Sequence, residues 1–424
     1  MINETKIYKY RWMILAIAWI AYFVMYLQRF AIPPLSPFIQ EEFALTLTQV
    51  GLLMSVNGLG YVIMQMPGGW LVDRIGVAKM LLIGEVFAGI MMTAMSFTPS
   101  YKVSLILLGF GGLGCGCLLT ATSKAIMLWF PVHERGTAMG LKQTSCNIGG
   151  VLGALTLPTL AIAFGWRYGF GIVGIIAIAV GITSFFLYKE HPAEKNQPAP
   201  SVKKSGDNTS GLMREILFNR ELILLGIVGA CFATIEFSAI TYLVTYLKET
   251  MLFSVVIAGG FLAVFEGAGA FGKPLFGLLS DRFFNGSRKK AYFLISIIIF
   301  IACFIMALLP SDTPKWSLYL VFIIFGLGAN GWSGVHFTFV GESVSEKSMG
   351  LAMGMSIAVS GLSIVTGPPL FGYIVDRTGE YTPAWYFLAL CSIISIILII
   401  FIREKKKKYL FNESEQTKHK SPGE

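Results

Sequence analysis

Charged residues are scarce in this chain of 424 residues, where Asp, Glu, Lys and Arg together make up 13%. In soluble domains about a quarter of the residues are charged. Hydrophobic residues make up 55% of the chain, and its mean hydropathy is +0.68. The polar side chains are too few to cover the surface of a water-soluble protein of this length. The composition therefore excludes an ordinary soluble fold.

Signatures of several enzyme classes are also absent. The sequence contains no GK[ST] phosphate-binding motif, no HExxH zinc motif and no GxSxG nucleophile motif. A glycine run at Gly109–Gly114 matches part of a nucleotide-binding pattern, but it lies in an apolar segment that no strand precedes. We therefore predict neither ATP-driven pumping nor hydrolysis, and we expect a protein that is not an enzyme and that holds no cofactor and no metal.

The cysteines give no sign of a metal site or of a disulfide framework. They lack zinc-ligand spacing, and each lies inside an apolar segment rather than in an extramembrane loop. We interpret all six as small packing residues. They are Cys115, Cys117, Cys146, Cys231, Cys303 and Cys391.

Long apolar runs, by contrast, are abundant. A bilayer core of ~30 Å requires about 20 helical residues per crossing, and twelve runs of that length are bounded by charge, Gly or Pro. Nothing alternates in polarity as barrel strands do. In the first half the runs are Trp12–Phe38, Thr48–Gly68, Lys79–Phe97, Lys102–Phe130, Gly136–Phe164 and Tyr168–Tyr188. In the second half they are Glu221–Leu247, Val255–Leu279, Ala291–Leu309, Trp316–Gly341, Met349–Val375 and Pro383–Ile402.

One long polar segment divides these runs into two sets of six. It is rich in Pro, Ser, Lys and Asn, as linkers are. We predict an N-terminal six-helix bundle at 1–188, a cytosolic linker at 189–220, a C-terminal bundle at 221–403 and a basic cytosolic tail at 404–424. The basic residues gather in alternate loops, which favours a multi-pass protein of the cell membrane with both termini in the cytosol, and argues against nucleic-acid binding.

Two loops in equivalent places share a Gly-x-x-x-Asp-Arg core. GWLVDRIGVAK follows the second run, and GLLSDRFFNGSRKK follows the eighth. We expect Gly69 and Gly277 to allow close helix approach, and the aspartates to accept hydrogen bonds at helix N-termini. An ordinary charged loop is the alternative for either copy alone. The predicted conformational latch comprises Gly69, Asp73, Arg74, Gly76, Lys79, Asp281 and Arg282.

The first of these loops resembles the signature loop between helices 2 and 3 of the major facilitator superfamily. The resemblance extends over the whole chain. It implies two pseudo-symmetric six-helix bundles around a central site that opens alternately to each side. Val77 and Ala78 depart from the family pattern, because they stand where basic residues are frequent.

Four further segments resemble the anion:cation symporter branch and related organic-anion porters. Many members of that branch carry Asp before an Arg in the first helix, whereas this chain has Gln28, so the resemblance gives that position no proton role. The four segments are YLQRFAIPP at Tyr26–Pro34, WFPVHER at Trp129–Arg135, GWR at Gly165–Arg167 and GPPLFGYIVDRTG at Gly367–Gly379.

Ionisable residues deep in the membrane are candidates for function, because embedding an unpaired charge there costs several kcal/mol. Arg29 lies near the middle of the first run, with Tyr22 and Tyr26 at helical spacing on the same face. The pattern predicts an anion-binding stripe. An Arg that snorkels outward, or that a structural acid holds, is the alternative.

Several other polar residues are substrate-binding candidates. A basic residue at the position of Lys124 often helps to hold the anion in the resembling branch, although this lysine also lies close enough to a helix end to snorkel. Interhelical hydrogen bonding is the competing role for the uncharged side chains. The remaining candidates are Lys142, Gln143, Asn147, Asn330 and Trp332.

Glu236 and Glu266 are the predicted proton-coupling residues. We expect no other acid to lie so deep in the helices. Burial favours the uncharged carboxylic acid, so such a group can take up a proton on one side and release it on the other. A permanent structural ion pair is the alternative for each glutamate.

These observations favour a secondary active transporter for a small organic anion. We expect the anion to be a carboxylate and its transport to be coupled to protons. Its expected partners are the anionic substrate, protons and membrane lipid, and it is expected to be a monomer. Two alternatives remain open. One is a proton-driven exporter of drugs or cationic metabolites, and the other is a non-transporting solute sensor.

Overall fold

The computed structural model of this chain describes residues 4–190, 218–344 and 349–404. Within those residues, twelve helical spans are long and apolar enough to cross a membrane, as the sequence predicts. The first half contains α1 (Glu4–Arg29), α2 (Ile32–Phe43), α3 (Leu47–Ile75), α4 (Val77–Met95), α5 (Tyr101–Trp129), α6 (Val132–Phe164) and α7 (Trp166–Leu187). The second half contains α10 (Arg220–Thr250), α11 (Val255–Leu278), the π-helical turn η1 (Leu279–Phe283), α12 (Arg288–Leu308), α13 (Lys315–Glu342), α14 (Met349–Thr378) and α15 (Thr382–Phe401).

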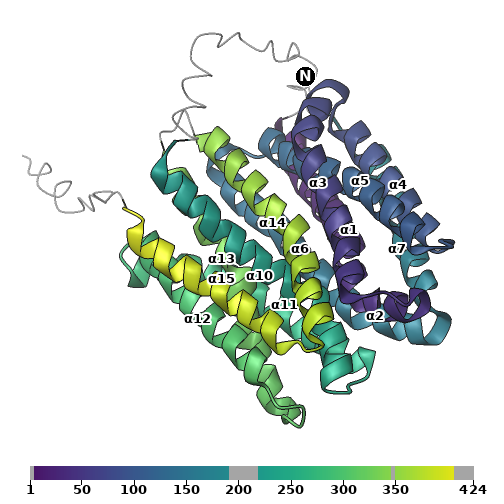
Figure 1. Cartoon of the computed structure of the whole chain (residues 1–424). Coiled ribbons are helices and arrows are strands. Elements are labelled where there is room, and N and C mark those ends of the chain that lie inside the picture. The colour runs from purple at the N-terminus through teal and green to yellow at the C-terminus, as the bar shows by residue number, and fades with distance from the viewer. Residues whose placement is uncertain (1–3, 191–217, 345–348, 405–424) are drawn as a thin grey trace, which may run out of the picture.

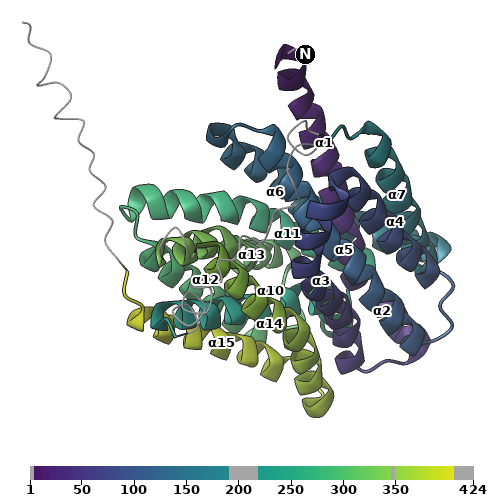
Figure 2. The same ribbon diagram turned by 90° about the horizontal axis from the view of Figure 1, so that it is seen from above.

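The helices form two bundles that lie side by side. Figure 1 shows the first bundle in purple and blue and the second in green and yellow, with their long axes roughly parallel. Seen from above, α4 and α7 lie on the outer side of one bundle, and α12 and α15 on the outer side of the other (Figure 2). The most extensive contacts between the bundles, among the described residues, are those of α3 with α14 and of α6 with α11.

The first span is broken into two helices. α1 ends at Arg29, and α2 begins at Ile32. Pro33 and Pro34 have no backbone N–H group, so the carbonyls four residues before them have no helical partner at this point. Arg29 does lie near the middle of the first span, Tyr10–Phe43, as expected, but that span is not one continuous helix. This residue ends α1 beside an interruption in the span.

Hydrogen bonds between the bundles cluster at the end of the molecule where α2 leads into α3, which we name the α2–α3 end. The hydroxyl of Tyr242 on α10 donates to the carbonyl of Leu47 at 2.7 Å. The hydroxyls of Ser36 and Thr245 lie 3.4 Å apart across the same junction. The two bundles are therefore fastened together at this end.

Most of the predicted linker and tail lies outside the described residues. The structure describes none of 191–217 and none of 405–424. The linker at 189–220, the tail at 404–424 and the bundle boundaries drawn from them therefore stay predictions.

Candidate functional site

Arg29 is buried without a charged partner. Its side chain is 1% exposed, and its guanidinium lies over the ring of Tyr61 at 4.0 Å and near the ring of Tyr26 at 5.7 Å. Its Nε and Nη2 atoms have no hydrogen-bond acceptor, and no carboxylate among the described residues forms an ion pair with it. Two donors of a buried cation thus remain unsatisfied, which is costly unless a ligand supplies the acceptors.

Lys142 on α6 is a second buried cation close to the first. Its ammonium group lies 4.1 Å from the ring centroid of Tyr22 and 3.0 Å from the hydroxyl of Ser123. The rings of Tyr22 and Tyr26 are 5.0 Å apart. Gln143 is exposed and lies beside Tyr22. The tyrosine pair therefore connects two cations that no acid of the described residues neutralises.

Asn147 joins the two bundles at mid-depth. Its side-chain oxygen accepts a hydrogen bond from Lys273 on α11 at 3.0 Å, and its amide donates to the backbone carbonyl of Glu266 at 3.3 Å. A Cβ atom at Gly150, one helical turn further along α6, would lie 3.1 Å from the carboxyl carbon of Glu266. The glycine therefore permits α6 to pack directly against this acid.

The second bundle contributes acids to the same region. Glu236 on α10 accepts a hydrogen bond from the indole of Trp332 at 2.8 Å. Glu266 is 2% exposed, lies beside Asn330 and has one carboxylate oxygen without a partner. Both acids lie close enough to Lys273 to interact with it electrostatically, and Arg29 acts on Glu236 across the bundle junction.

These residues form one connected group, which we name the central group. Its first-bundle members supply two cations and a tyrosine pair, and its second-bundle members supply two acids and one lysine. All but one of the predicted substrate-binding residues and both predicted proton-coupling residues belong to it. Its members are Tyr22, Tyr26, Arg29, Tyr61, Lys142, Gln143, Asn147, Glu236, Glu266, Lys273, Asn330 and Trp332.

Lys124 is the predicted binding residue that lies elsewhere. Its ammonium group forms an ion pair with Asp73 at 2.8 Å and donates to the carbonyl of Val72 at 3.1 Å. It therefore ties α5 to the end of α3. In this position it belongs with the predicted latch rather than with the central group.

The second copy of the latch loop pairs differently. Arg288, at the start of α12, forms ion pairs with Asp281 and with Glu342 of α13. Arg282 is exposed. Sequence reasoning missed Arg288, although the basic run that follows the second Asp-Arg pair was a usable signal. Each copy of the loop thus joins helices within its own bundle.

The prediction that Gly69 and Gly277 allow a close approach of neighbouring helices is wrong. A Cβ atom at Gly69 or at Gly277 would meet nothing within 4 Å, so neither glycine allows a close helix approach. Gly76 is different, because its φ of +86° lies in the region that disfavours side chains. This residue ends α3 and begins α4 in one step. Arg74 lies over the ring of Trp70 at 3.9 Å, and Lys79 is exposed.

Glu85 contradicts the expectation that only two acids lie deep in the helices. It is the ninth of the 19 residues of α4 and is fully buried. The amide of Gln28 donates to one of its carboxylate oxygens at 3.0 Å. The sequence did contain the signal. The expected span began at Lys79, two residues later than α4 does, which placed Glu85 too near a helix end.

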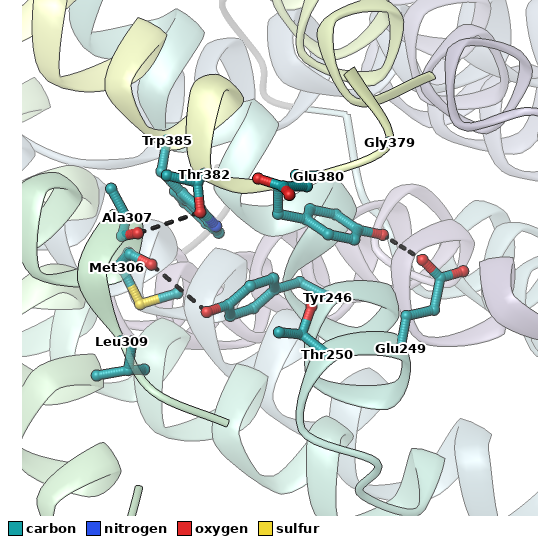
Figure 3. Close-up of a pocket in the computed structure, with 11 residues that line it drawn as sticks. Tyr246, Glu249, Thr250, Met306, Ala307, Leu309, Gly379, Glu380, Thr382 and Trp385 are labelled. Atoms are coloured by element: carbon teal, nitrogen blue, oxygen red, sulfur yellow. Dashed lines mark hydrogen bonds between the residues drawn. The ribbon is translucent and has the colours of Figure 1, made fainter. Parts of the chain in front are cut away.

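A separate pocket opens in the second bundle at the α2–α3 end. It has a volume of about 320 Å³. Figure 3 shows Glu249 and Glu380 at this pocket, together with the rings of Tyr246 and Trp385. Its lining, within the described residues, includes two carboxylates and no Lys or Arg. This charge repels anions, so the pocket does not suit the ligand that the central group would hold.

The comparison with known proteins gives the family. Residues 18–340 and 287–423 match the Major Facilitator Superfamily. The chain belongs to this superfamily. Its membership confirms the predicted all-α membrane fold of two six-helix bundles.

Curated proteins that resemble the chain include some named as transporters of organic anions and one named as a membrane sensor. The probable sulfoacetate transporter SauU of Cupriavidus necator is 28% identical, over 88% of this chain and 89% of its own length. The hexuronate transporter of Bacillus subtilis is 24% identical, over 90% of this chain and 92% of its own. The membrane sensor protein UhpC of Salmonella typhimurium is also 24% identical, over 90% and 88%.

A solved structure supports the fold independently. The bacterial homologue of the human lysosomal transporter Spinster, in an inward-facing and occupied conformation, superposes with a TM-score of 0.75. The comparison covers 93% of this chain and 96% of that one at 19% identity. At that identity the likeness extends to the fold alone.

Proposed function

We propose that this protein is a secondary active transporter that moves a small organic anion with a carboxylate group across the cell membrane. The observation that carries the proposal is Arg29, a buried guanidinium with two donors unsatisfied and no acid in ion-pair contact among the described residues. A guanidinium presents a planar fork of donors that fits a carboxylate or a sulfonate. The named substrates of two relatives, sulfoacetate and hexuronate, carry such groups.

The central group could bind the charged part of such a ligand in the first bundle and contact the ligand again where the two bundles meet. Arg29 and Lys142 would hold the negative charge, with the tyrosine pair between them excluding water. Asn147 lies where both bundles meet, so contact between it and the ligand would link binding to the motion of one bundle against the other. No step of this cycle makes or breaks a covalent bond, so the protein is not an enzyme.

Proton coupling is assigned to Glu236 and Glu266. The two carboxylates lie in mutual electrostatic range and share one cation, Lys273. Two like charges beside one lysine favour retention of a proton by the pair. An anion bound at Arg29 would cancel the positive field that acts on Glu236, so proton and anion would bind more tightly together than apart.

A cation exporter fits the central group less well. In that alternative Glu236 or Glu266 would bind a cationic drug directly. Lys273 already acts on both acids, and the first bundle adds two unpaired cations that would repel such a ligand. A solute sensor keeps one observation in its favour, the resemblance to UhpC. A sensor would bind the anion at the same residues without carrying it.

Binding and transport are tested on purified protein. Thermal unfolding is measured with sulfoacetate, a hexuronate, a neutral hexose and a quaternary ammonium compound. A ligand at 100 times its Kd adds ~2.7 kcal/mol to the free energy of unfolding, which is a measurable rise in Tm. We expect a rise with an anion and no change with the other two compounds.

Uptake into proteoliposomes then separates the alternatives. A transporter accumulates the anion when the outside is made acidic. A sensor binds without accumulation, and an exporter of cations responds to the ammonium compound alone. Either of the last two results contradicts the proposal. The same vesicles, probed with protease at either end of the chain, test the proposed cytosolic position of both termini.

A further inference from the structure

Gln28 and Glu85 form a closed polar pair between α1 and α4. Glu85 is 0% exposed and Gln28 is 1% exposed. The side-chain amide of Gln28 donates to Oε2 of Glu85 at 3.0 Å. The two remaining oxygens, Oε1 of each residue, have no hydrogen-bond partner in the described part of the chain. Two buried oxygens of this pair therefore lack a hydrogen-bond donor.

The missing component of the pair is a donor. Both unsatisfied atoms are oxygens, and an ionised glutamate can only accept hydrogen bonds. A proton on Glu85 gives the pair a second donor for its unsatisfied oxygens, and it leaves Oε2 to accept from the amide. Exchanging the amide oxygen and nitrogen of Gln28 does not change the result, because two oxygens would then face each other at 3.0 Å and would require a proton between them.

The uncharged amide of Gln28 is the one hydrogen-bond donor that Glu85 has among the described residues. No basic side chain forms an ion pair with it among the described residues, and a lone buried carboxylate costs several kcal/mol. On α5, Cys115 is a thiol within range of both Glu85 and Arg29. On α7, the backbone at Gly181 packs against the Cβ atom of Glu85.

The other elements around α4 bring few titratable groups to this site. α1 presents Gln28 and, one residue later, Arg29. α3 presents Tyr61, whose ring lies against that arginine. The titratable residues of α7, Arg167 and Tyr168, lie at its first turn, more than ten residues from Gly181. Arg29 is linked to this site through Cys115, because both Arg29 and Glu85 interact electrostatically with that thiol.

We propose that Glu85 is a proton-carrying residue of the transport cycle, that burial beside Gln28 keeps it in its protonated form in this conformation, and that it is coupled to the anion through Arg29. The inference rests on the proposed function. It adds a proton site in the first bundle, on the side where the anion binds, to the acids of the second bundle.

The sign of the coupling follows from the charges. A positive guanidinium nearby favours the ionised form of Glu85 and so opposes its proton. An anion on Arg29 cancels that charge, so Glu85 keeps its proton more firmly when the substrate is bound. Glu85 is 0% exposed here, so it can exchange its proton with solvent only in another conformation.

Infrared spectroscopy tests the protonation without any substrate. The parent protein at neutral pH should show the carbonyl band of a protonated carboxylic acid. Glu85→Gln, which keeps the shape and the amide contact, should lose the part of this absorption that Glu85 contributes, while any band from the Glu236–Glu266 pair remains. Glu190→Gln, at an exposed acid outside the central group, should keep the absorption of Glu85. If Glu85→Gln fails to fold, Glu85→Asp serves instead and should keep a shifted band. An unchanged spectrum in Glu85→Gln, or loss of the Glu85 absorption in Glu85→Asp with no shifted band in its place, overturns the proposal.

Transport tests the coupling. Glu85→Gln should exchange substrate across the vesicle membrane in counterflow within about twofold of the parent rate, but accumulate it no further when a proton gradient is imposed. Proton-driven accumulation equal to that of the parent overturns the proposal. If the parent neither binds nor carries any anion, the proposed function fails, and the infrared band alone then decides whether Glu85 holds a proton.

Discussion

Asp376 of the second bundle caps the start of a helix in the first bundle through Thr48. Its carboxylate accepts hydrogen bonds from both the backbone N–H and the hydroxyl of Thr48, at 2.8 and 2.5 Å. The other carboxylate oxygen accepts from the N–H of Leu47 at 2.8 Å. An acid at a helix N-terminus is favoured by the unpaired N–H groups and by the helix dipole. The carboxylate that caps α3 thus comes from the opposite bundle, and these hydrogen bonds hold the two bundles together at the α2–α3 end.

Asp376→Ala should loosen that end. Loss of a helix cap costs about 1 kcal/mol, which is roughly a fivefold shift between two conformations. Spin labels placed at the exposed positions Phe97 and Leu252 report the separation of the bundles at this end. We expect a larger population of long distances in Asp376→Ala. Glu380→Ala, which removes an exposed acid four residues away, is the control, and an equal shift in that variant would contradict the prediction.

Asp73 and Lys124 should behave as one unit. We predict that Asp73→Asn, Lys124→Ala and Arg74→Ala each slow transport while solute binding stays largely intact, because the latch holds helices and does not touch the substrate. A double-mutant cycle on Asp73 and Lys124 should give a non-additive loss. Fully additive effects on transport, or loss of ligand-induced thermal stabilisation in a folded variant, would argue against a latch.

Glu236→Gln and Glu266→Gln test the second-bundle proton site. At least one variant should lose proton-driven accumulation and retain counterflow, because a permanent amide cannot carry a proton through the cycle. Both activities are measured in the same proteoliposomes. Should both variants accumulate substrate against its gradient as the parent does, coupling does not run through these acids.

Gly150→Ala should weaken the packing between α6 and α11. The added Cβ atom would lie 2.9 Å from a ring carbon of Phe30 and 3.1 Å from the carboxyl carbon of Glu266. Overpacking of this kind costs about 1–3 kcal/mol. Gly140→Ala is the matched control on the same helix, where a Cβ atom meets nothing within 4 Å. Thermal unfolding should show a lower Tm for Gly150→Ala than for the parent protein and an unchanged Tm for Gly140→Ala. Equal Tm values in the two variants would contradict the packing account.

The fold could be predicted from the sequence because hydrophobic length is a strong signal in membrane proteins. The twelve apolar runs correspond to the twelve spans, and the duplicated Asp-Arg loop marked the repeat. The break after Arg29 could also have been predicted, since Pro33 and Pro34 stand next to each other in the printed chain. Two adjacent prolines are a usable signal for a break in a helical span.

Side-chain partners could not be predicted in the same way. Whether Lys124 points toward the anion site or toward Asp73 depends on the rotation of α5 about its axis, which a mostly apolar helix hardly records in its sequence. The Gln28–Glu85 pair likewise joins helices whose facing residues no periodicity fixes. Depth in the membrane can be estimated from sequence, whereas the facing partner requires the packed structure.

The anion site at Arg29 is the central claim, and one titration tests it most directly. An anion that raises the Tm of the parent protein is titrated into the parent and into Arg29→Lys, with folding confirmed by an unchanged helical circular dichroism spectrum. Lysine keeps the charge but loses the planar fork, and loss of a buried charge-assisted contact costs about 2–5 kcal/mol, which is roughly 30-fold or more in Kd. We predict that binding to Arg29→Lys weakens by at least that factor. An unchanged Kd in the folded variant would contradict the account.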